Sequence, residues 1–266
     1  MKRRRFLQLA GTTAAGAIVR TSSFASLIHD REVSITIGGP SLGAAEAIQV
    51  RAGERVRFHF VHAGGCEDVH LHLSGHRFIV VALDGNPVPN PAAVEVLSLV
   101  AGERIHAMVE MSNPGNWILG SLDDADRAGG HSVSVAYANQ YGLVQWNPPA
   151  AVDWSYARFG GSARTVPPPD QMVEMLLERR PGPGGRGVHW IIDGQSCSDF
   201  EQLSFQPGRR YRLRMMNATD RAQAVRLPKH NFALTRVNQI PVSGIVKDTV
   251  RLERYNVIEA DMLERL

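Results

Sequence analysis

Hydrophobic and polar residues alternate along most of this chain. A period of two predicts half-buried β-strands, because successive side chains of a strand point to opposite faces of its sheet. In the first half of the chain the pattern predicts strands at residues 56–62, 69–73, 78–82, 94–99, 104–110 and 132–137. All of these segments are short, so we expect a fold built from many short strands.

Turn-forming sequences separate the predicted strands. Asp84-Gly-Asn-Pro87 and Asn113-Pro-Gly115 interrupt the alternation, and Pro followed by Gly in the second suits a type II turn. The glycine-rich residues 182–187 lie between two strand-like segments with no helix after them, which favours a hairpin loop over a phosphate-binding loop. Many short strands joined by such turns predict an all-β sandwich or barrel.

The pattern occurs twice, with an offset of about 155 residues. Residues 55–63 match 210–218, and residues 103–111 match 253–261. The first copy continues beyond its last matching segment to about Ala138, whereas the second has only five further residues. Because an internal repeat sets the architecture of a chain, we expect two similar domains in tandem, the second without its last strands.

The repeat divides the chain into four parts, and each domain is large enough to bury a core. We expect a leader at residues 1–25, a β-domain at 30–138, a linker rich in Pro and Gly at 139–170, and an incomplete β-domain at 171–266. The linker is expected to lie across the domains through its aromatic residues.

The first 25 residues have the pattern of an export signal. Arg3 and Arg4 stand before Phe-Leu, and a soft apolar stretch at 9–19 precedes a small-residue site near Ala25. This leader resembles a bacterial twin-arginine signal peptide and predicts a periplasmic or extracellular protein. The stretch is too short to span a bilayer, and the alternative is a basic tail that anchors the chain to a membrane. We expect no integral membrane segment in the mature protein.

The charge of the remaining chain argues against nucleic-acid binding, although the sequence pI is about 9.1. Five basic residues and no acidic residue precede Ala25. Removing these five charges from the formal net charge of +3 leaves −2. The mature protein is therefore mildly acidic and lacks the excess of positive charge that a nucleic acid attracts.

Three segments resemble a known family. Residues 78–88, 109–119 and 244–250 resemble the second and third cupredoxin (plastocyanin-like) domains of three-domain multicopper oxidases, the laccase-like enzymes. The resemblance covers nearly the whole mature chain and implies two Greek-key β-sandwiches. It also implies copper as the cofactor, and an oxidoreductase that takes electrons from a substrate and reduces dioxygen.

The resemblance also implies copper ligands, and this chain does not carry them. In the family, a His-Cys-His triplet follows the Asn-Pro-Gly turn and supplies the thiolate of the blue copper site. Gly120-Ser-Leu122 occupies that place in the first copy, which fits a copper-free middle domain. The second copy ends before its turn.

A second ligand strand of the family is altered as well. Gln223 stands where the blue-copper His is expected, and Arg226 and Pro228 replace two ligands of the trinuclear copper cluster. A guanidinium cannot ligate copper at neutral pH, and proline has no side-chain donor. Only His230 remains, at a position that is not a direct ligand in the family. The resemblance therefore predicts the fold but assigns no catalytic residue.

One cluster has the spacing of a metal site: Cys66, His70, His72 and His76. His70 and His72 share one face of a predicted strand, and a thiolate with imidazoles suits copper or zinc. The alternative is that the leucine face of this strand fills the core while the histidine face meets solvent or a neighbouring domain. His76 matches His230 in the repeat, which favours a structural role at a bend.

The second cysteine and the remaining histidines carry no comparable signal. Cys197 lies in the other copy, at a position that is not equivalent to Cys66, so no disulfide is expected. The other histidines considered are scattered along the sequence: His59, His62, His106, His131 and His189.

Three interpretations remain open. The first is an exported multicopper-oxidase homologue that is not expected to turn over a substrate as this chain alone. The second is a non-catalytic cupredoxin-like binding module, which would use the His70 and His72 face or a free sheet edge to bind a partner such as another oxidase-type domain or chain. The third is a degenerate gene fragment whose missing strands lie downstream in another reading frame.

Overall fold

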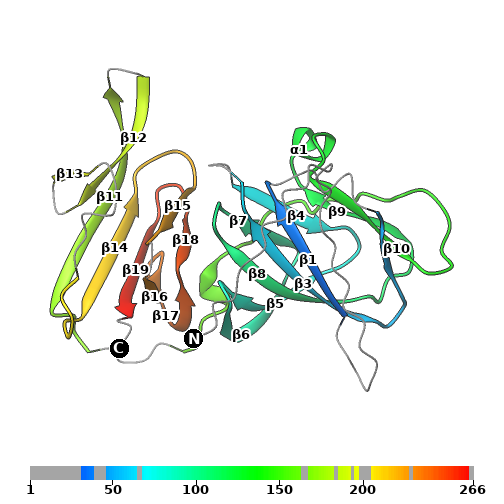
Figure 1. The fold of residues 1–266 in the computed structure, drawn as a ribbon, viewed down its shortest axis with the longest axis horizontal. Helices are drawn as coiled ribbons and strands as arrows, with labels where there is room; N and C mark the ends of the chain where they lie inside the picture. The colour runs from blue at the N-terminus through cyan, green and yellow to red at the C-terminus, as the bar shows by residue number, and fades with distance from the viewer. Residues whose placement is uncertain are drawn as a thin grey trace, which may run out of the picture.

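The computed structural model describes residues 31–38, 46–64, 68–162, 167–182, 185–192, 195–197, 205–227 and 230–263. Strands make up nearly all of its regular structure, and they form two β-sandwiches (Figure 1). The all-β fold predicted from the alternation is confirmed. Arg3, Arg4, Cys66 and Pro228 lie outside the described residues.

The first sandwich packs two five-stranded sheets face to face. One sheet has the order β1 (Arg31–Ile37), β3 (Arg55–His62), β8 (Arg104–Glu110), β5 (Phe78–Leu83) and β6 (Asn86–Val94). The other has the order β2 (Ile48–Val50), β10 (Ser132–Tyr137), β9 (Asn116–Ser121), β4 (Val69–Leu73) and β7 (Val96–Leu99). A short helix, α1 (Asp124–Ala128), lies between β9 and β10.

The second sandwich combines a seven-stranded sheet with a two-stranded sheet. The larger sheet has the order β13 (Gln195–Cys197), β12 (Gly185–Ile192), β11 (Gln171–Gly182), β14 (Tyr211–Asn217), β19 (Val257–Leu263), β16 (Asn231–Val237) and β17 (Ile240–Lys247). The smaller sheet pairs β15 (Gln223–Arg226) with β18 (Thr249–Leu252). β11 and β12 form the hairpin that the glycine-rich segment predicts.

The two sandwiches repeat one arrangement of strands. β1 runs parallel to β3 in the first, and β11 runs parallel to β14 in the second. The order β3-β8-β5-β6 then recurs as β14-β19-β16-β17. The smaller sheets differ, because β4 pairs with both β7 and β9, whereas β15 pairs only with β18 among the described residues. The domain limits predicted from the sequence stay a prediction.

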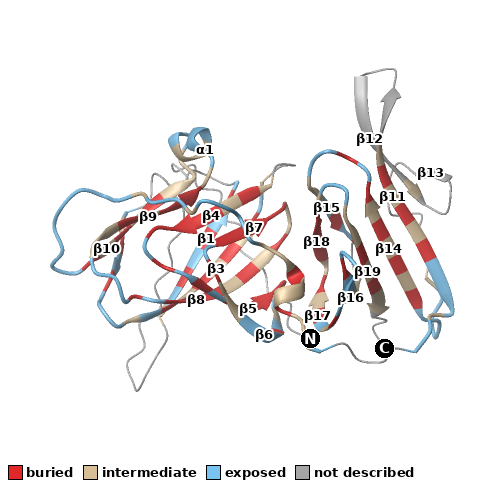
Figure 2. Cartoon of the chain, turned by 180° about the vertical axis from the view of Figure 1, so that it is seen from behind, coloured by how far each residue is buried: buried red, intermediate tan, exposed pale blue. Residues whose placement is uncertain are grey.

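Apolar side chains on the inward faces of the strands form the core. Phe58, Phe60 and Phe78 are fully buried in the first sandwich, and Phe232 is fully buried in the second. Figure 2 shows buried residues alternating with more exposed ones along β11 and β14. This alternation is the structural form of the period-two pattern in the sequence.

The linker runs along two facing sheet edges, one formed by β6 and the other by β17. β6 and β17 are edge strands and lie next to each other (Figure 1). Asn90 donates its backbone N–H to the Phe159 carbonyl, and Gly161 donates its backbone N–H to the Ser243 carbonyl, both at 3.0 Å. β6 has three residues without a backbone N–H, which limits direct pairing of the two sheets: Pro87, Pro89 and Pro91.

Gly244 of β17 packs against Pro89 of β6. Its φ is +77°, and a Cβ at this position would lie 2.5 Å from Cγ of Pro89. We expect Gly244→Ala to lower the free energy of unfolding by about 1 to 2 kcal/mol for the left-handed backbone, and by about 1 to 3 kcal/mol more for the overlap with the proline ring. Urea denaturation followed by tryptophan fluorescence measures this loss.

Gly208→Ala is the matched control. Gly208 has a φ of +78°, but a Cβ there would meet no atom within 4 Å. This variant should show only the backbone cost. Equal losses in the two variants would mean that β6 and β17 do not hold this close contact in solution.

Candidate functional site

β15 carries two of the residues at which the family resemblance places copper ligands. Gln223 pairs with Leu252, and Arg226 pairs with Thr249, both on β18. Gln223 is half-buried and Arg226 is exposed. Neither side chain supplies an imidazole or a thiolate, so these residues do not fit copper. Pro228, the third such residue, lies outside the described part of the chain.

His70 and His72 lie on the same face of β4, and each uses both ring nitrogens within the protein. Nδ1 of His70 lies 2.8 Å from Ser98 Oγ, and Nε2 lies 3.4 Å from an oxygen of Asp68. Nδ1 of His72 lies 2.8 Å from the Glu95 carbonyl oxygen, and Nε2 lies 3.0 Å from a backbone carbonyl of the linker. In this arrangement neither ring offers a free nitrogen to a metal.

His76 holds the turn that follows β4. Its Nδ1 donates to the Ser74 carbonyl at 2.9 Å, and its Nε2 accepts from the Tyr137 hydroxyl at 2.6 Å. Burial lowers the pKa of His76, which favours the neutral ring that these two bonds require. Burial also raises the pKa of Tyr137 to about 12. The Tyr137 hydroxyl in turn accepts from the Asn113 backbone N–H at 3.3 Å.

The predicted metal site at Cys66, His70, His72 and His76 stays a prediction. Cys66 lies outside the described residues, and within the described ranges no three His, Cys, Asp or Glu side chains are grouped to hold a metal ion. An open hollow of about 300 Å³ lies beside His72 and His76. The hydrogen bonds of these histidines agree with the structural alternative.

Asp68, His70 and Ser98 form a bonded series without the properties of a nucleophilic triad. Ser98 is fully buried, so a substrate cannot reach its hydroxyl. Asp68 is also bound to Arg251 of β18, with 2.6 Å between Oδ2 and Nη2. The hydrogen bond from His70 and the Arg251 guanidinium hold the pKa of Asp68 well below its usual range. The series therefore links the two sandwiches.

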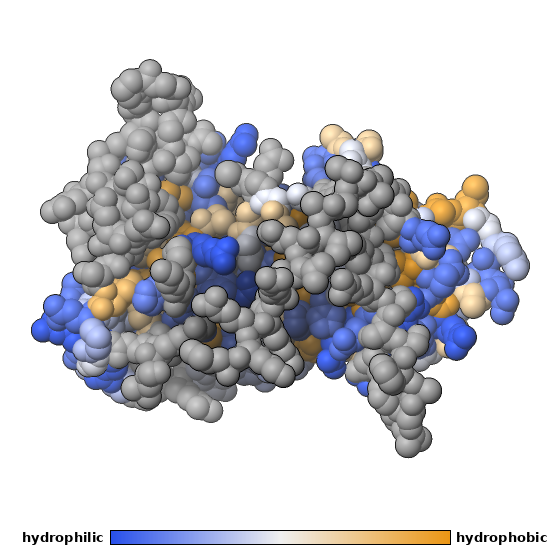
Figure 3. Space-filling model, in the orientation of Figure 1, coloured by the Kyte–Doolittle hydropathy of each residue, from blue (hydrophilic) through white to orange (hydrophobic). Residues whose placement is uncertain are grey.

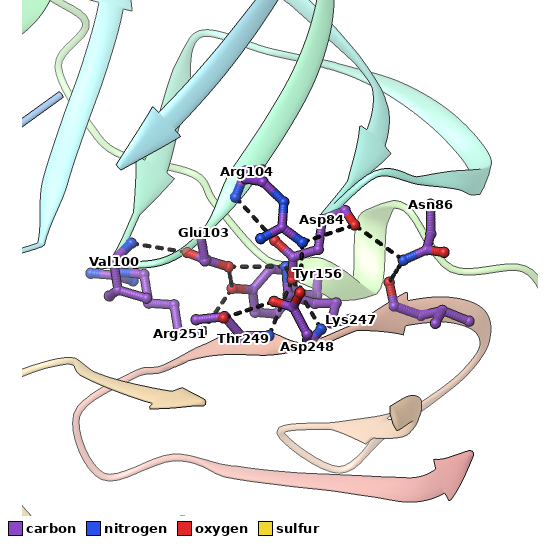
Figure 4. A network of polar contacts seen from close by, with 11 residues as sticks. Asp84, Asn86, Val100, Glu103, Arg104, Tyr156, Lys247, Asp248, Thr249 and Arg251 are labelled. Carbon is purple, nitrogen blue, oxygen red and sulfur yellow. Dashed lines mark hydrogen bonds and ion pairs between the residues drawn. The ribbon is translucent and has the colours of Figure 1, made fainter. Parts of the chain in front are cut away.

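A buried ionic cluster forms the main polar contact between the sandwiches (Figure 4). Lys247 of β17 is fully buried, and its Nζ lies 3.0 Å from Asp84 Oδ2 and 3.0 Å from Glu103 Oε1. Asp84 lies in the turn between β5 and β6, and Glu103 directly precedes β8. The contacts lack the angles of a hydrogen bond, so the attraction is chiefly ionic.

The linker contributes Tyr156 to the same cluster. Its hydroxyl donates to Glu103 and accepts the backbone N–H of Arg251 at 2.9 Å. Its ring lies under Lys247, with 4.8 Å between Nζ and the ring centre. Burial and the Glu103 charge raise the pKa of Tyr156 well above its ordinary value, so this phenol is a neutral donor.

An exposed side of the same interface carries a second ion pair. Arg104 of β8 and Asp248, which lies between β17 and β18, are joined by a 2.6 Å contact between Nη2 and Oδ2. Both side chains are partly exposed, so solvent screens this pair and its contribution to stability is small. The backbone N–H of Arg104 also donates to Asp84 Oδ1 at 3.0 Å.

Burial affects the protonation of Glu103 and of Lys247 differently. Loss of hydration raises the pKa of Glu103, although the Lys247 charge opposes this shift. Burial lowers the pKa of Lys247, but the charges of Glu103 and Asp84 outweigh it and the net shift is upward. Lys247 therefore remains charged, and Glu103 is a carboxyl group that burial makes ready to take a proton.

Glu103→Gln tests this assignment through the pH dependence of stability. Because the pKa of Glu103 is higher in the folded state, its contribution is fully present below the ordinary value of 4.5 and is lost as pH rises through the folded pKa. The amide imitates the protonated form. We therefore expect a smaller loss of unfolding free energy in the variant than in the wild type as pH rises from 4 to 8, measured by urea denaturation.

Lys247→Met provides the contrast. It leaves two buried carboxyl groups without their cation and should lower the free energy of unfolding by about 3 to 5 kcal/mol at neutral pH. If Glu103→Gln were as destabilising as Lys247→Met, the cluster would require an ionised Glu103.

Comparison with known proteins identifies a family for the first sandwich. Residues 13–141 match the family model described as multicopper oxidase. No curated protein sequence matches the chain. The matched range includes all ten strands of the first sandwich.

Solved multicopper oxidases share the fold. Fet3p, a multicopper oxidase that functions in iron import, aligns with a TM-score of 0.62 and 11% identity over 82% of this chain and 52% of its own. The laccase-like CueO from Ochrobactrum sp. aligns with a TM-score of 0.58 and 18% identity over 84% and 51%. The multicopper oxidase from Campylobacter jejuni, a metallo-oxidase, aligns with a TM-score of 0.57 and 12% identity over 90% and 59%.

This chain spans between about half and three fifths of the length of these solved relatives. At such low identities the alignments establish a common fold and no residue of a site. Together with the match over residues 13–141, they confirm the resemblance carried by residues 78–88 and 109–119, and the first sandwich is similar to the multicopper oxidase family.

Proposed function

We propose that this chain is an exported scaffold of the multicopper oxidase type that does not itself oxidise a substrate. Family and fold support the copper-oxidase ancestry, and copper is the metal that the family implies. The oxidase reaction is a property of relatives of which this chain covers little more than half. Under this proposal, the two sandwiches of this chain form a folded scaffold that can dock a partner, and they carry out no oxidation.

The residues on β15 carry the proposal. The family resemblance places Gln223 and Arg226 at the positions of two imidazole ligands, and a guanidinium that is always protonated cannot bind copper. In the first sandwich, β9 ends in Gly120 and Ser121, where the family would place its thiolate and imidazoles. Because these residues do not fit the copper centres of the family, no electron-transfer step is assigned to them.

Export is the second part of the proposal. The twin-arginine pattern of Arg3 and Arg4, followed by a short apolar stretch, supports passage of the folded protein to the periplasm or beyond. Within the part of the chain that the structure describes, no helix is long and apolar enough to span a membrane. Fractionation of cells that express the chain with Arg3→Lys and Arg4→Lys would show whether export depends on this pair.

Loading with copper tests the catalytic part. We expect copper(II) added to the purified protein to produce no intense thiolate-to-copper absorption in the visible range and no oxidation of a phenol under air, because a blue site needs a thiolate and two imidazoles. A laccase assayed in parallel is the positive control. A blue band that appears together with phenol oxidation would overturn the proposal, whatever the copper content.

A second candidate function is the docking of another oxidase-type domain or chain. The edge of β15 that faces away from β18 has no strand beside it among the described residues, whereas β4 pairs with β9 at the corresponding edge. An unpaired edge can accept an added strand. Tyr141 and Leu143 are 94% and 90% exposed, and Figure 3 shows hydrophobic residues at the outer end of the first sandwich.

Hydrogen exchange distinguishes a free edge from a covered one. In the isolated chain, we expect the β15 amides that do not bond to β18 to exchange fast, while β4 amides, which lie between two strands, are protected. Binding of a partner at this edge would slow exchange in β15 alone. Uniform protection of β15 in the isolated monomer would contradict a free edge.

A further inference from the structure

Lys247 places a primary amine against two carboxyl groups in a site closed to water. Its side chain and those of Asp84 and Glu103 are all fully buried. Its Nζ lies 3.0 Å from an oxygen of each carboxyl group but has no hydrogen-bond partner in the described structure (Figure 4). Because buried polar groups nearly always form hydrogen bonds, this close contact without one calls for an explanation.

Backbone donors hold the Asp84 carboxyl group in place. Its Oδ1 accepts the N–H of Arg104 at 3.0 Å. Its Oδ2 accepts the N–H groups of Asp248 and Thr249, each at 3.3 Å. Fixed N–H groups aimed at the oxygens of an acyl group stabilise the negative charge that develops there when a nucleophile adds to its carbon. The carboxyl group of Asp84 is therefore both oriented and activated for attack.

Glu103 is placed to move protons between the reacting groups. Its Oε2 accepts the backbone N–H of Val100 at 2.9 Å, and its Oε1 accepts the Tyr156 hydroxyl. These two bonds fix the carboxyl group, and the same Oε1 lies 3.0 Å from Lys247 Nζ. Burial raises the pKa of Glu103, and a carboxyl group with a raised pKa can give and take a proton near neutral pH.

We propose that Lys247 and Asp84 condense to an intramolecular isopeptide bond that joins β17 to the turn between β5 and β6. The new bond links Nζ to Cγ, and one water molecule is released. An amine and a carboxylic acid condense without any change of oxidation state, so the step needs no further reactant. The ionic cluster is the open form that precedes the bond. The bond lies within one chain and does not depend on the function proposed above.

Proton transfers within the cluster balance the reaction. A proton passes from the Lys247 ammonium group to Oδ2 of Asp84, which leaves a neutral amine and a neutral acid; exclusion of water favours uncharged groups. The Nζ lone pair then forms the bond to Cγ while an electron pair of the carbonyl moves to Oδ1.

Glu103 completes the step. It takes a proton from the nitrogen and gives its own proton to the leaving Oδ2. The bond between Cγ and Oδ2 breaks, water leaves, and the electron pair on Oδ1 restores the carbonyl. Holding the amine beside the acyl group supplies an effective concentration of about 10⁵ to 10⁸ M.

Mass spectrometry of the purified full chain, denatured and digested with trypsin, tests the bond. Trypsin cuts after lysine and arginine, but not after a lysine whose Nζ is acylated. We expect one branched peptide that joins residues 78–104 to residues 237–251 and weighs one water molecule less than the two together. Denaturant separates an ion pair, so only a covalent bond gives this product. Cleavage of the wild type after Lys247, with residues 78–104 released as a free peptide, would overturn the proposal.

Three variants assign the roles. Lys247→Arg should give no branched peptide, because a guanidinium is always protonated and is no nucleophile. Asp84→Asn should give the same branched peptide as the wild type, since the side-chain amide loses ammonia and leaves the same product. Glu103→Gln should slow formation of the bond by about 10²- to 10⁴-fold, the usual contribution of general acid–base catalysis.

Asp248→Asn is the matched control. Asp248 lies at the same interface and pairs with Arg104, but its carboxyl group is not a partner of Lys247. This variant should form the bond to the same extent as the wild type. A Glu103→Gln chain that forms the bond as fast as the wild type would overturn the role given to Glu103. The wild-type digest decides on the bond itself even where a variant fails to fold. The unfolding free energies predicted above refer to the open form.

Discussion

The buried charge of Lys247 is the constraint on which the arrangement of the two sandwiches depends. Removing an ammonium group from water costs several kcal/mol, and only close opposite charges offset that cost. Asp84 and Glu103 place carboxyl oxygens 3.0 Å from its Nζ, and both belong to the other sandwich. Separating the sandwiches, or sliding one along the other, would leave an ammonium group and carboxyl groups without partners. The ionic cluster therefore specifies one relative position, which apolar contacts alone would define less sharply.

The linker joins the two sandwiches and also helps to fix their relative position. Tyr156 is buried and bonded to Glu103, and Gly161 is bonded to the edge of β17. The prolines of β6 limit pairing between the two large sheets. As a result, the linker backbone supplies hydrogen bonds that direct pairing of the edges would otherwise supply. The two sandwiches therefore meet through side chains and through the linker. The strands of each large sheet pair only within that sheet.

The sequence predicted the all-β class and several strands of the first sandwich, but it did not predict the contacts between distant elements. Alternation located β3, β4, β5 and β8, because a strand with one buried face carries apolar residues at every second position. The alternation analysis did not identify β2, whose three residues are too few to establish a period. Lys247 reads as an ordinary surface lysine, since its burial depends on Asp84, which is more than 160 residues earlier. The pairing of His59 with His106 follows only from the register of β3 with β8.

Comparison of β4 with β15 shows how one fold can persist while its chemistry changes. β4 keeps histidines, but Ser98, Asp68 and backbone carbonyls occupy their nitrogens. β15 has Gln223 and Arg226 instead, yet Val225 remains fully buried as the strand requires. The inward positions are constrained by the packing of the core, whereas the outward positions are free to form hydrogen bonds and ion pairs. Function in such a protein therefore has to be argued from the side chains on the outward faces and not from the fold.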